Sequence, residues 1–179
     1  LLGRLRIGIV GAGGTGSCVA EQLARLGVGA LLLSDDDLFD RTNVNRVYGS
    51  RVSDHGKPKI EILSMRLKEI GLGTKVHLVH RPVVYQSAMR ELLRCDLVFG
   101  CTDDEWGRAL LNQLAASFFL PVVDMGVKIH SHEGRIGSIE GRVTTLMPGA
   151  ACLGCRGRIN PERIAAESRE VLNPEEGAR

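Results

Sequence analysis

The residues of this chain best suited to chemistry are an arginine, a lysine and two carboxylates near a glycine-rich turn. They are Arg46 in the run that begins at Asn43, Lys59 at the end of Gly-Lys-Pro-Lys, and Asp103 followed by Asp104. Arginine and lysine offset the charge of a triphosphate, and a carboxylate holds Mg²⁺ against it. Hydride transfer does not need this set, so these residue types together indicate phosphoryl or nucleotidyl transfer.

The glycine-rich turn is Gly11-Ala-Gly-Gly-Thr-Gly16, and it directly follows a short apolar run. In that context it matches the dinucleotide-binding pattern: Gly11 allows a tight turn, Gly13 lets the backbone approach phosphate, and Gly16 lets helix and strand pack closely. The next helix would offer free N–H groups and a positive dipole end to an anion. The turn predicts a nucleotide site without choosing among NAD, FAD, S-adenosylmethionine and ATP.

Asp35 stands at the end of the next apolar run, 19 positions after Gly16. A carboxylate there can accept hydrogen bonds from ribose hydroxyls and would repel a 2′-phosphate, which argues against NADP. If the stretch from Asn43 to Arg46 forms one helical turn, these two side chains share a face. The additional arginine, lysine and aspartate favour ATP with Mg²⁺ over the other nucleotides.

The elements that must position these residues alternate along the first two thirds of the chain. We expect strands at 4–10, 30–34, 75–80, 96–100 and 121–125, and helices at 17–26, 58–70 and 105–118. From Gly126 the pattern changes to two antiparallel strands, 127–132 and 135–146, joined by a turn at Glu133-Gly134. The predicted fold is α/β: a Rossmann-like, doubly wound and mostly parallel sheet with antiparallel strands at its C-terminal edge. Asp103 would then face the ligand crevice beyond the carboxyl ends of the strands.

Composition excludes several classes of protein. The net charge of +2 and the sequence pI of about 8.4 are far from the profile of a nucleic-acid binder. No apolar run reaches the roughly 20 residues of a membrane span. Five cysteines at uneven spacing argue against a disulfide framework and for a reducing compartment. We therefore predict a cytoplasmic protein without membrane or nucleic-acid partners.

Together the motifs resemble the adenylating domain of the MoeB/ThiF family, relatives of the eukaryotic ubiquitin-activating enzymes. The matching motifs are Gly11-Ala-Gly-Gly-Thr-Gly16, Asp35-Asp-Asp37, Asn43-Val-Asn-Arg46, Gly56-Lys-Pro-Lys59, Cys101-Thr-Asp103 and Cys152-x-x-Cys155. The resemblance runs from Arg4 to about Arg158, and its details are most similar to bacterial ThiF-family adenylyltransferases that act on ubiquitin-like proteins.

The resemblance implies a reaction and a set of roles. The terminal glycine carboxylate of a small ubiquitin-like or sulfur-carrier protein would attack the α-phosphate of ATP, and pyrophosphate would leave. No protein nucleophile is needed, so catalysis is positioning and charge stabilisation. Arg46, Lys59 and Asp103 would be catalytic, with Asp103 holding Mg²⁺. The ATP site would comprise Gly11, Gly13, Gly14, Gly16, Asp35, Asp37, Asn43, Arg46, Lys59, Asp103 and Asp104.

Some positions depart from the family pattern or extend beyond it. Asp104 stands where the family has asparagine, and its extra charge would either add a metal ligand or weaken ATP binding. In the family, an arginine from a partner's N-terminal segment completes the site, and a relay cysteine follows the cysteine pair. We therefore expect a homodimer and a longer natural protein, of which these 179 residues alone adenylate poorly.

The pair Cys152 and Cys155 supplies two of the four thiolates of a structural zinc site, and the resemblance implies a second pair beyond residue 179. Two spare thiols or a redox pair are the alternatives. We assign residues 1–150 to an ATP-binding adenylation domain and 151–179 to a cysteine loop with a charged tail.

Other functions stay open. An NAD-dependent oxidoreductase would explain the turn and Asp35 but not the cationic residues. A tRNA-modifying dehydratase of the same superfamily also adenylates a carboxylate, but would need a nucleic-acid surface. A catalytically silent scaffold half of an activating enzyme would typically lose the arginine, lysine or aspartate that this chain keeps.

Overall fold

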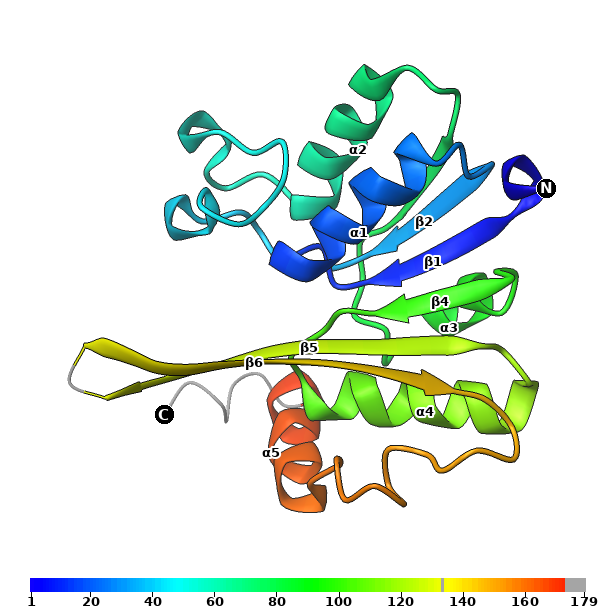
Figure 1. Ribbon diagram of the computed structural model, residues 1–179, viewed down its shortest axis with the longest axis vertical. Helices are drawn as coiled ribbons and strands as arrows, with labels where there is room; N and C mark the ends of the chain where they lie inside the picture. The colour runs from blue at the N-terminus through cyan, green and yellow to red at the C-terminus, as the bar shows by residue number, and fades with distance from the viewer. Residues whose placement is uncertain (133, 173–179) are drawn as a thin grey trace.

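A computed structural model of the chain describes residues 1–132 and 134–172, and its centre is one six-stranded sheet (Figure 1). The strands are β1 (Arg6–Val10), β2 (Ala30–Ser34), β3 (Lys75–Val79), β4 (Leu97–Gly100), β5 (Val122–His132) and β6 (Arg135–Leu146). Their order is β3-β2-β1-β4-β5-β6; neighbouring strands are parallel except for the antiparallel pair β5 and β6. The predicted fold class is confirmed.

Helices cover both faces of this sheet because alternate strand residues point to opposite sides. The helices are α1 (Gly14–Arg25), α2 (Lys59–Ile70), α3 (Gln86–Leu92), α4 (Glu105–Phe118) and α5 (Pro161–Leu172). Leu31 and Leu33 of β2 lie in the core that contains residues of α1 and α2, whereas Leu32 lies in the core that contains residues of α3 and α4. Burial on two faces explains why β2 has an uninterrupted apolar run.

The antiparallel pair is longer than the other strands and leaves the body of the molecule as a hairpin (Figure 1). Only residues 122–124 of β5 pair with β4, whereas its pairing with β6 runs from Val122 to His132. The prediction of separate strands at 121–125 and 127–132 is wrong. Gly126 does not break the strand, because its backbone is not left-handed and the β-branched residues around it favour extended chain.

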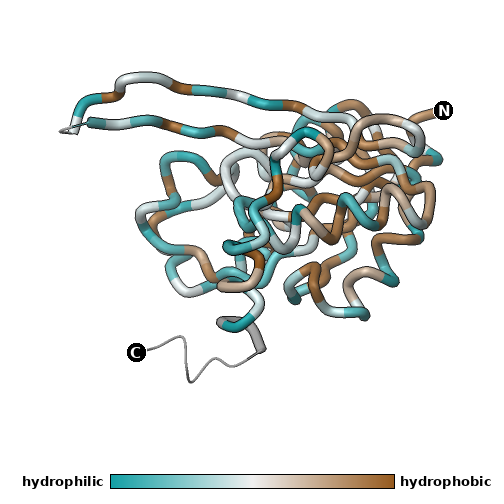
Figure 2. The backbone as a smooth tube through the Cα atoms, turned by 90° about the horizontal axis from the view of Figure 1, so that it is seen from below, coloured by the Kyte–Doolittle hydropathy of each residue, from teal (hydrophilic) through white to brown (hydrophobic). Residues whose placement is uncertain are grey.

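One face of the hairpin is apolar and exposed to solvent. Val127, Ile129, Ile139 and Val143 are between 58% and 64% exposed. They alternate with polar residues, which Figure 2 shows as alternating colour along both strands. This alternation is the pattern of a two-stranded ribbon with one polar and one apolar face.

Other boundaries differ in smaller ways. α1 begins at Gly14, three residues before the predicted start, because the glycine-rich turn itself supplies its first turn. α3 is seven residues long and was not predicted. The charged tail forms α5 up to Leu172, and residues 173–179 lie outside the described residues. In the described part of the chain, no helix is long and apolar enough to cross a membrane.

Candidate functional site

The glycine-rich turn joins β1 to α1 and needs glycine at the first and third glycine positions of the pattern for steric reasons. Gly11 has a φ of +90°, and a Cβ there would lie 2.8 Å from the carbonyl oxygen of Cys101. A Cβ on Gly16 would lie 1.8 Å from the carbonyl oxygen of Gly11. Gly13 is the N-cap of α1, and no atom lies within 4 Å of the position that its Cβ would take. The backbone at the helix N-terminus is therefore open to an anion.

Asp35 follows the end of β2 and is bound to the glycine-rich turn. Its Oδ2 accepts the N–H of Ala12 at 2.5 Å, and its Oδ1 accepts the N–H of Asp37 at 2.8 Å. Burial raises the pKa of the Asp35 carboxyl, and these two N–H donors counteract part of that rise. The carboxylate is held at the base of the turn, where the sequence predicts a ribose ligand.

The two predicted cationic residues reach the same region from different segments. The Nζ of Lys59, in the first turn of α2, lies 2.6 Å from Oδ2 of Asp37, and its side chain is 13% exposed. Arg46 lies over the turn, because a Cβ on Gly14 would be 3.3 to 3.4 Å from its side-chain carbons. The guanidinium of Arg46 donates to the carbonyl of Thr42 at 3.0 Å. Both cations are therefore beside the glycine-rich turn.

Asn43 has a different environment from Arg46. It is buried, its Oδ1 accepts the N–H of Asp40 at 3.3 Å, and it completes a capping box on the 3₁₀ helix Arg41–Asn43. The side chain is absent from the cavity lining, which includes Arg46. Its contact with phosphate stays a prediction.

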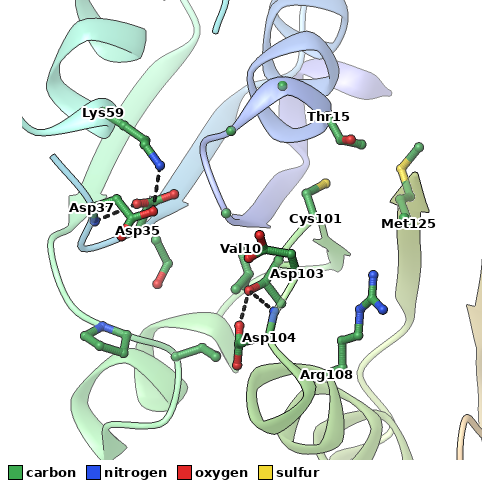
Figure 3. Close-up of a pocket in the computed structure, with 18 of the residues that line it drawn as sticks. Val10, Thr15, Asp35, Asp37, Lys59, Cys101, Asp103, Asp104, Arg108 and Met125 are labelled. Atoms are coloured by element: carbon green, nitrogen blue, oxygen red, sulfur yellow. Dashed lines mark hydrogen bonds and ion pairs between the residues drawn. The ribbon is translucent and has the colours of Figure 1, made fainter. Parts of the chain in front are cut away.

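The segment after β4 carries two carboxylates with different partners. Asp103 is exposed and lies between the glycine-rich turn and α4 (Figure 3). Asp104 is the N-cap of α4: it accepts the N–H of Gly107 and the hydroxyl of Thr102. The Asp104 carboxylate therefore has a local structural role, and Asp103 is the carboxylate of the two that is available to a cation.

These residues line one cavity of about 930 Å³ at the carboxyl ends of the parallel strands (Figure 3). Of the predicted residues, it is lined by Gly11, Gly13, Gly14, Asp35, Asp37, Arg46, Lys59, Asp103 and Asp104. Gly16 lies beneath the turn. The volume is within the range of sites for small molecules and cofactors.

The cavity also contains residues that the sequence did not reveal. Arg108, one turn into α4, faces it, and so does Glu167 of α5, which accepts the N–H of Trp106 at 2.8 Å. Arg108 could have been found from its i,i+4 spacing to Asp104 on the predicted helix. Glu167 had no such signal, because its position depends on how the tail folds back over α4.

The cysteine pair lies away from the cavity. The sulfurs of Cys152 and Cys155 are 3.5 Å apart, close to the roughly 3.8 Å between two sulfurs on one tetrahedral zinc with bonds of about 2.3 Å. The backbone N–H of Cys155 lowers the pKa of the Cys152 thiol to about 7. Leu153 between them is buried against the core and holds the loop on α4 through Asn112. The pair fits half of a zinc site.

Known proteins resemble this chain in sequence and in fold. The model of the ThiF family matches residues 1–175. The SAMP-activating enzyme E1 of Haloferax volcanii is 31% identical over 84% of this chain and 52% of its own length. The sulfur carrier protein ThiS adenylyltransferase of Escherichia coli is 28% identical over 64% of this chain and 46% of its own. The chain therefore spans about half the length of these curated relatives. Among solved structures, E. coli MccB with ATP has the same fold, with a TM-score of 0.70 at 21% identity over 94% of this chain and 49% of MccB.

Proposed function

Because the chain belongs to the ThiF family, we propose that it binds ATP with Mg²⁺ and adenylates the C-terminal glycine carboxylate of a small ubiquitin-like or sulfur-carrier protein. The observation that carries this proposal is the cavity in which the glycine-rich turn, Asp35, Arg46, Lys59 and Asp103 converge. This chain covers about half the length of the two relatives that are named as an activating enzyme and an adenylyltransferase.

The residues present fit a nucleotide. The open space above Gly13 and the uncapped N-terminus of α1 leave room and N–H donors for phosphate. Asp35 would hold the ribose hydroxyls, and Arg46 and Lys59 would offset charge on the phosphates. Lys59 would exchange its ion pair with Asp37 for a phosphate oxygen.

The metal also has a suitable ligand. Mg²⁺ prefers carboxylate and phosphate oxygens, and the exposed Asp103 offers a carboxylate at the cavity. Bound there, Mg²⁺ would neutralise charge on the triphosphate. The protein would contribute orientation and fixed positive charge, and the reaction requires no acid or base from the chain.

The first experiment is a thermal shift of the chain with ATP, with ATP and Mg²⁺, and with NAD. A ligand at about 100 times its Kd adds about 2.7 kcal/mol, which is several degrees in melting temperature for a chain of this size. We expect stabilisation by ATP with Mg²⁺, and not by NAD. Stabilisation by NAD alone would instead support a dehydrogenase.

Asp103→Ala separates the metal site from the fold. We expect the melting temperature without ligand to stay within about 2 °C, because the side chain is exposed. The extra stabilisation that Mg²⁺ adds to ATP should be lost. An unchanged Mg²⁺ effect in this variant would exclude Asp103 as the ligand.

Further parts of the proposal concern the whole protein. We propose that Cys152 and Cys155 form half of a structural zinc site, that residues 1–150 form the adenylation domain and 151–179 the cysteine loop and tail, and that the protein acts as a homodimer. Metal analysis and light scattering of a longer chain test the zinc site and the dimer.

A further inference from the structure

A buried carboxylate in β5 is shared by arginines from two other elements. Asp124 is 1% exposed. Its Oδ2 accepts a hydrogen bond from Nη2 of Arg142 on β6 at 3.0 Å, and its Oδ1 lies 3.4 Å from Nε of Arg108 on α4. The side chains of Arg108 and Arg142 are 14% and 29% exposed. Asp124 therefore connects the wall of the cavity to the base of the hairpin.

This cluster is incompletely hydrogen-bonded. In the part of the chain that the structure describes, four buried side-chain atoms make no hydrogen bond, and three of them are Asp124 Oδ1, Arg108 Nε and Arg142 Nε. The contact of 3.4 Å between Arg108 and Asp124 thus lacks hydrogen-bond geometry. Unpartnered buried polar atoms cost free energy, so this arrangement is not the one that stability alone favours.

The position of Arg108 also depends on a missing side chain. A Cβ on Gly126 would lie 2.6 Å from Nη2 of Arg108. Gly126 does not have a positive φ, so its backbone conformation is open to any residue. A side chain at this position would therefore displace the Arg108 guanidinium, which occupies the space that glycine leaves.

The charges of the cluster do not balance. Arg108 and Arg142 carry two positive charges and an ionised Asp124 carries one negative charge, which leaves one positive charge beside the cavity. Figure 3 shows Arg108 across the cavity from Lys59, beside Met125. A partly buried guanidinium with spare N–H donors is suited to a carboxylate or an acyl oxygen.

We propose that Asp124 and Gly126 are positioning residues that hold Arg108 against the acyl end of the substrate. This inference rests on the proposed adenylation, and it identifies Arg108 as the residue that binds the carboxylate of the substrate. During the step, a carboxylate oxygen bonds to the α-phosphorus and the bond from that phosphorus to the bridging oxygen breaks. Pyrophosphate leaves with the electron pair. Arg108 transfers no proton: it offsets the repulsion between carboxylate and phosphate and then binds the acyl carbonyl.

The test compares two adenosine sulfamate probes, one unacylated and neutral, the other acylated and, because acylation acidifies the sulfamate N–H, anionic like an acyl adenylate. They are adenosine 5′-sulfamate and 5′-O-(N-acetylglycylsulfamoyl)adenosine, whose acyl sulfamate mimics the bound acyl adenylate. Calorimetry gives the Kd of each for the wild type, Arg108→Gln, Gly126→Ala, Asp124→Asn and the double variant Arg108→Gln/Gly126→Ala. Glu21→Gln is the matched control, because Glu21 is also buried and shared by two arginines but does not line the cavity.

We expect Arg108→Gln, Gly126→Ala and Asp124→Asn to weaken the acetylglycyl probe about tenfold or more, as the loss of a hydrogen bond to a charged group would. The Kd of the parent sulfamate should change less than twofold. Gly126→Ala should add nothing in the Arg108→Gln background, because it acts through Arg108. The control should bind both probes as the wild type does.

Different failures point to different errors. If the wild type binds neither probe nor ATP, the proposed function is wrong and the inference falls with it. If the wild type binds both probes and Arg108→Gln keeps the same ratio of Kd values, the inference alone is wrong. Additive losses in the double variant would show that Gly126 does not act through Arg108. Asp124→Asn can lose stability, and Gly126→Ala then carries the test, since the Cβ meets only the flexible end of Arg108.

Discussion

Two buried carboxylates in this fold are each shared by two arginines, and their hydrogen bonding differs. Glu21 of α1 accepts four hydrogen bonds of 2.7 to 3.1 Å from Arg25 and Arg66, and it ties α1 to α2. Asp124 accepts one, from Arg142, and leaves Arg108 unaligned beside the cavity. The same set of groups serves stability where both guanidiniums are hydrogen-bonded to the carboxylate, and leaves capacity for a ligand where one of them is not.

Solvent explains part of this difference. The side chains of Arg25 and Arg66 are 50% and 34% exposed, so water can hydrate what Glu21 does not bind. Arg108 is 14% exposed, and its remaining donors have fewer waters within reach. An anion in the cavity would therefore gain more from Arg108 than from either arginine of the Glu21 cluster.

The largest effect that we expect on stability is from Asp124→Ala. Removal of this carboxylate leaves two partly buried guanidiniums without a counter-charge, which costs about 3–5 kcal/mol. The melting temperature should fall by roughly 6–20 °C in thermal unfolding. Arg142→Met in the same background should recover part of the loss by removing one of the charges. If it recovers nothing, charge imbalance is not the cause.

Glu21→Gln should cost less, about 1–3 kcal/mol, because Arg25 and Arg66 are exposed enough to be hydrated. Denaturant unfolding at neutral pH measures the loss. The stabilisation by ATP and Mg²⁺ should equal that of the wild type. A loss as large as that of Asp124→Ala, or a weaker response to ATP, would contradict the distinction between the two clusters.

The Glu21 cluster should also show a pH dependence. The hydrogen bonds from Arg66, and then those from Arg25, lower the pKa of Glu21 in the folded chain. A lowered carboxyl pKa gives stability that is present above the unfolded pKa of about 4.3 and is lost as the pH falls through the folded value. The difference in unfolding free energy between the wild type and Glu21→Gln should therefore be constant at pH 6–7. It should become smaller as the pH falls below about 4. A constant difference down to pH 3 would contradict it.

The smallest effect on stability that we expect is at Asp104, a carboxylate whose hydrogen-bond donors are Gly107 and Thr102. Asp104 caps α4 through neutral groups, and asparagine caps as well as aspartate, so Asp104→Asn should change stability by less than about 0.5 kcal/mol. Asp104→Ala should cost about 1 kcal/mol. The Asn variant also tests the extra charge at this position: tighter binding of ATP and Mg²⁺ in a titration would show that the charge opposes the nucleotide. If the Asn and Ala variants are equally destabilised, the cap is not the role of Asp104.

Most of the fold could be predicted because its signals are local. Uninterrupted apolar runs such as Leu31-Leu-Leu33 mark buried parallel strands, and the glycine-rich turn marks the start of the first helix. The prediction of two strands on either side of Gly126 is wrong, because a glycine at an extended φ looks the same in sequence as one at a turn. Tertiary pairing with β6 determines which it is.

The candidate site was predicted where a motif fixes both residue type and place. Asp35, Lys59 and Asp103 follow strands or begin helices, and all three line the cavity. Asn43 looked equivalent to Arg46, but its side chain serves the backbone of its own turn. The cluster of Asp124, Arg108 and Arg142 could not be predicted, because it joins three elements and no motif fixes the spacing of its residues.

The length of β5 connects the exposed ribbon to the wall of the cavity. The strand runs from the core of the sheet to the exposed ribbon, and its pairing with β6 continues without a register shift from Val122 to His130. Between His130 and Asp124 the ladder is therefore regular, and the bulge lies further out, between His130 and Ser131. A protein that binds the apolar face of the ribbon would therefore contact the same continuous strand that carries Asp124 and Gly126 beside Arg108.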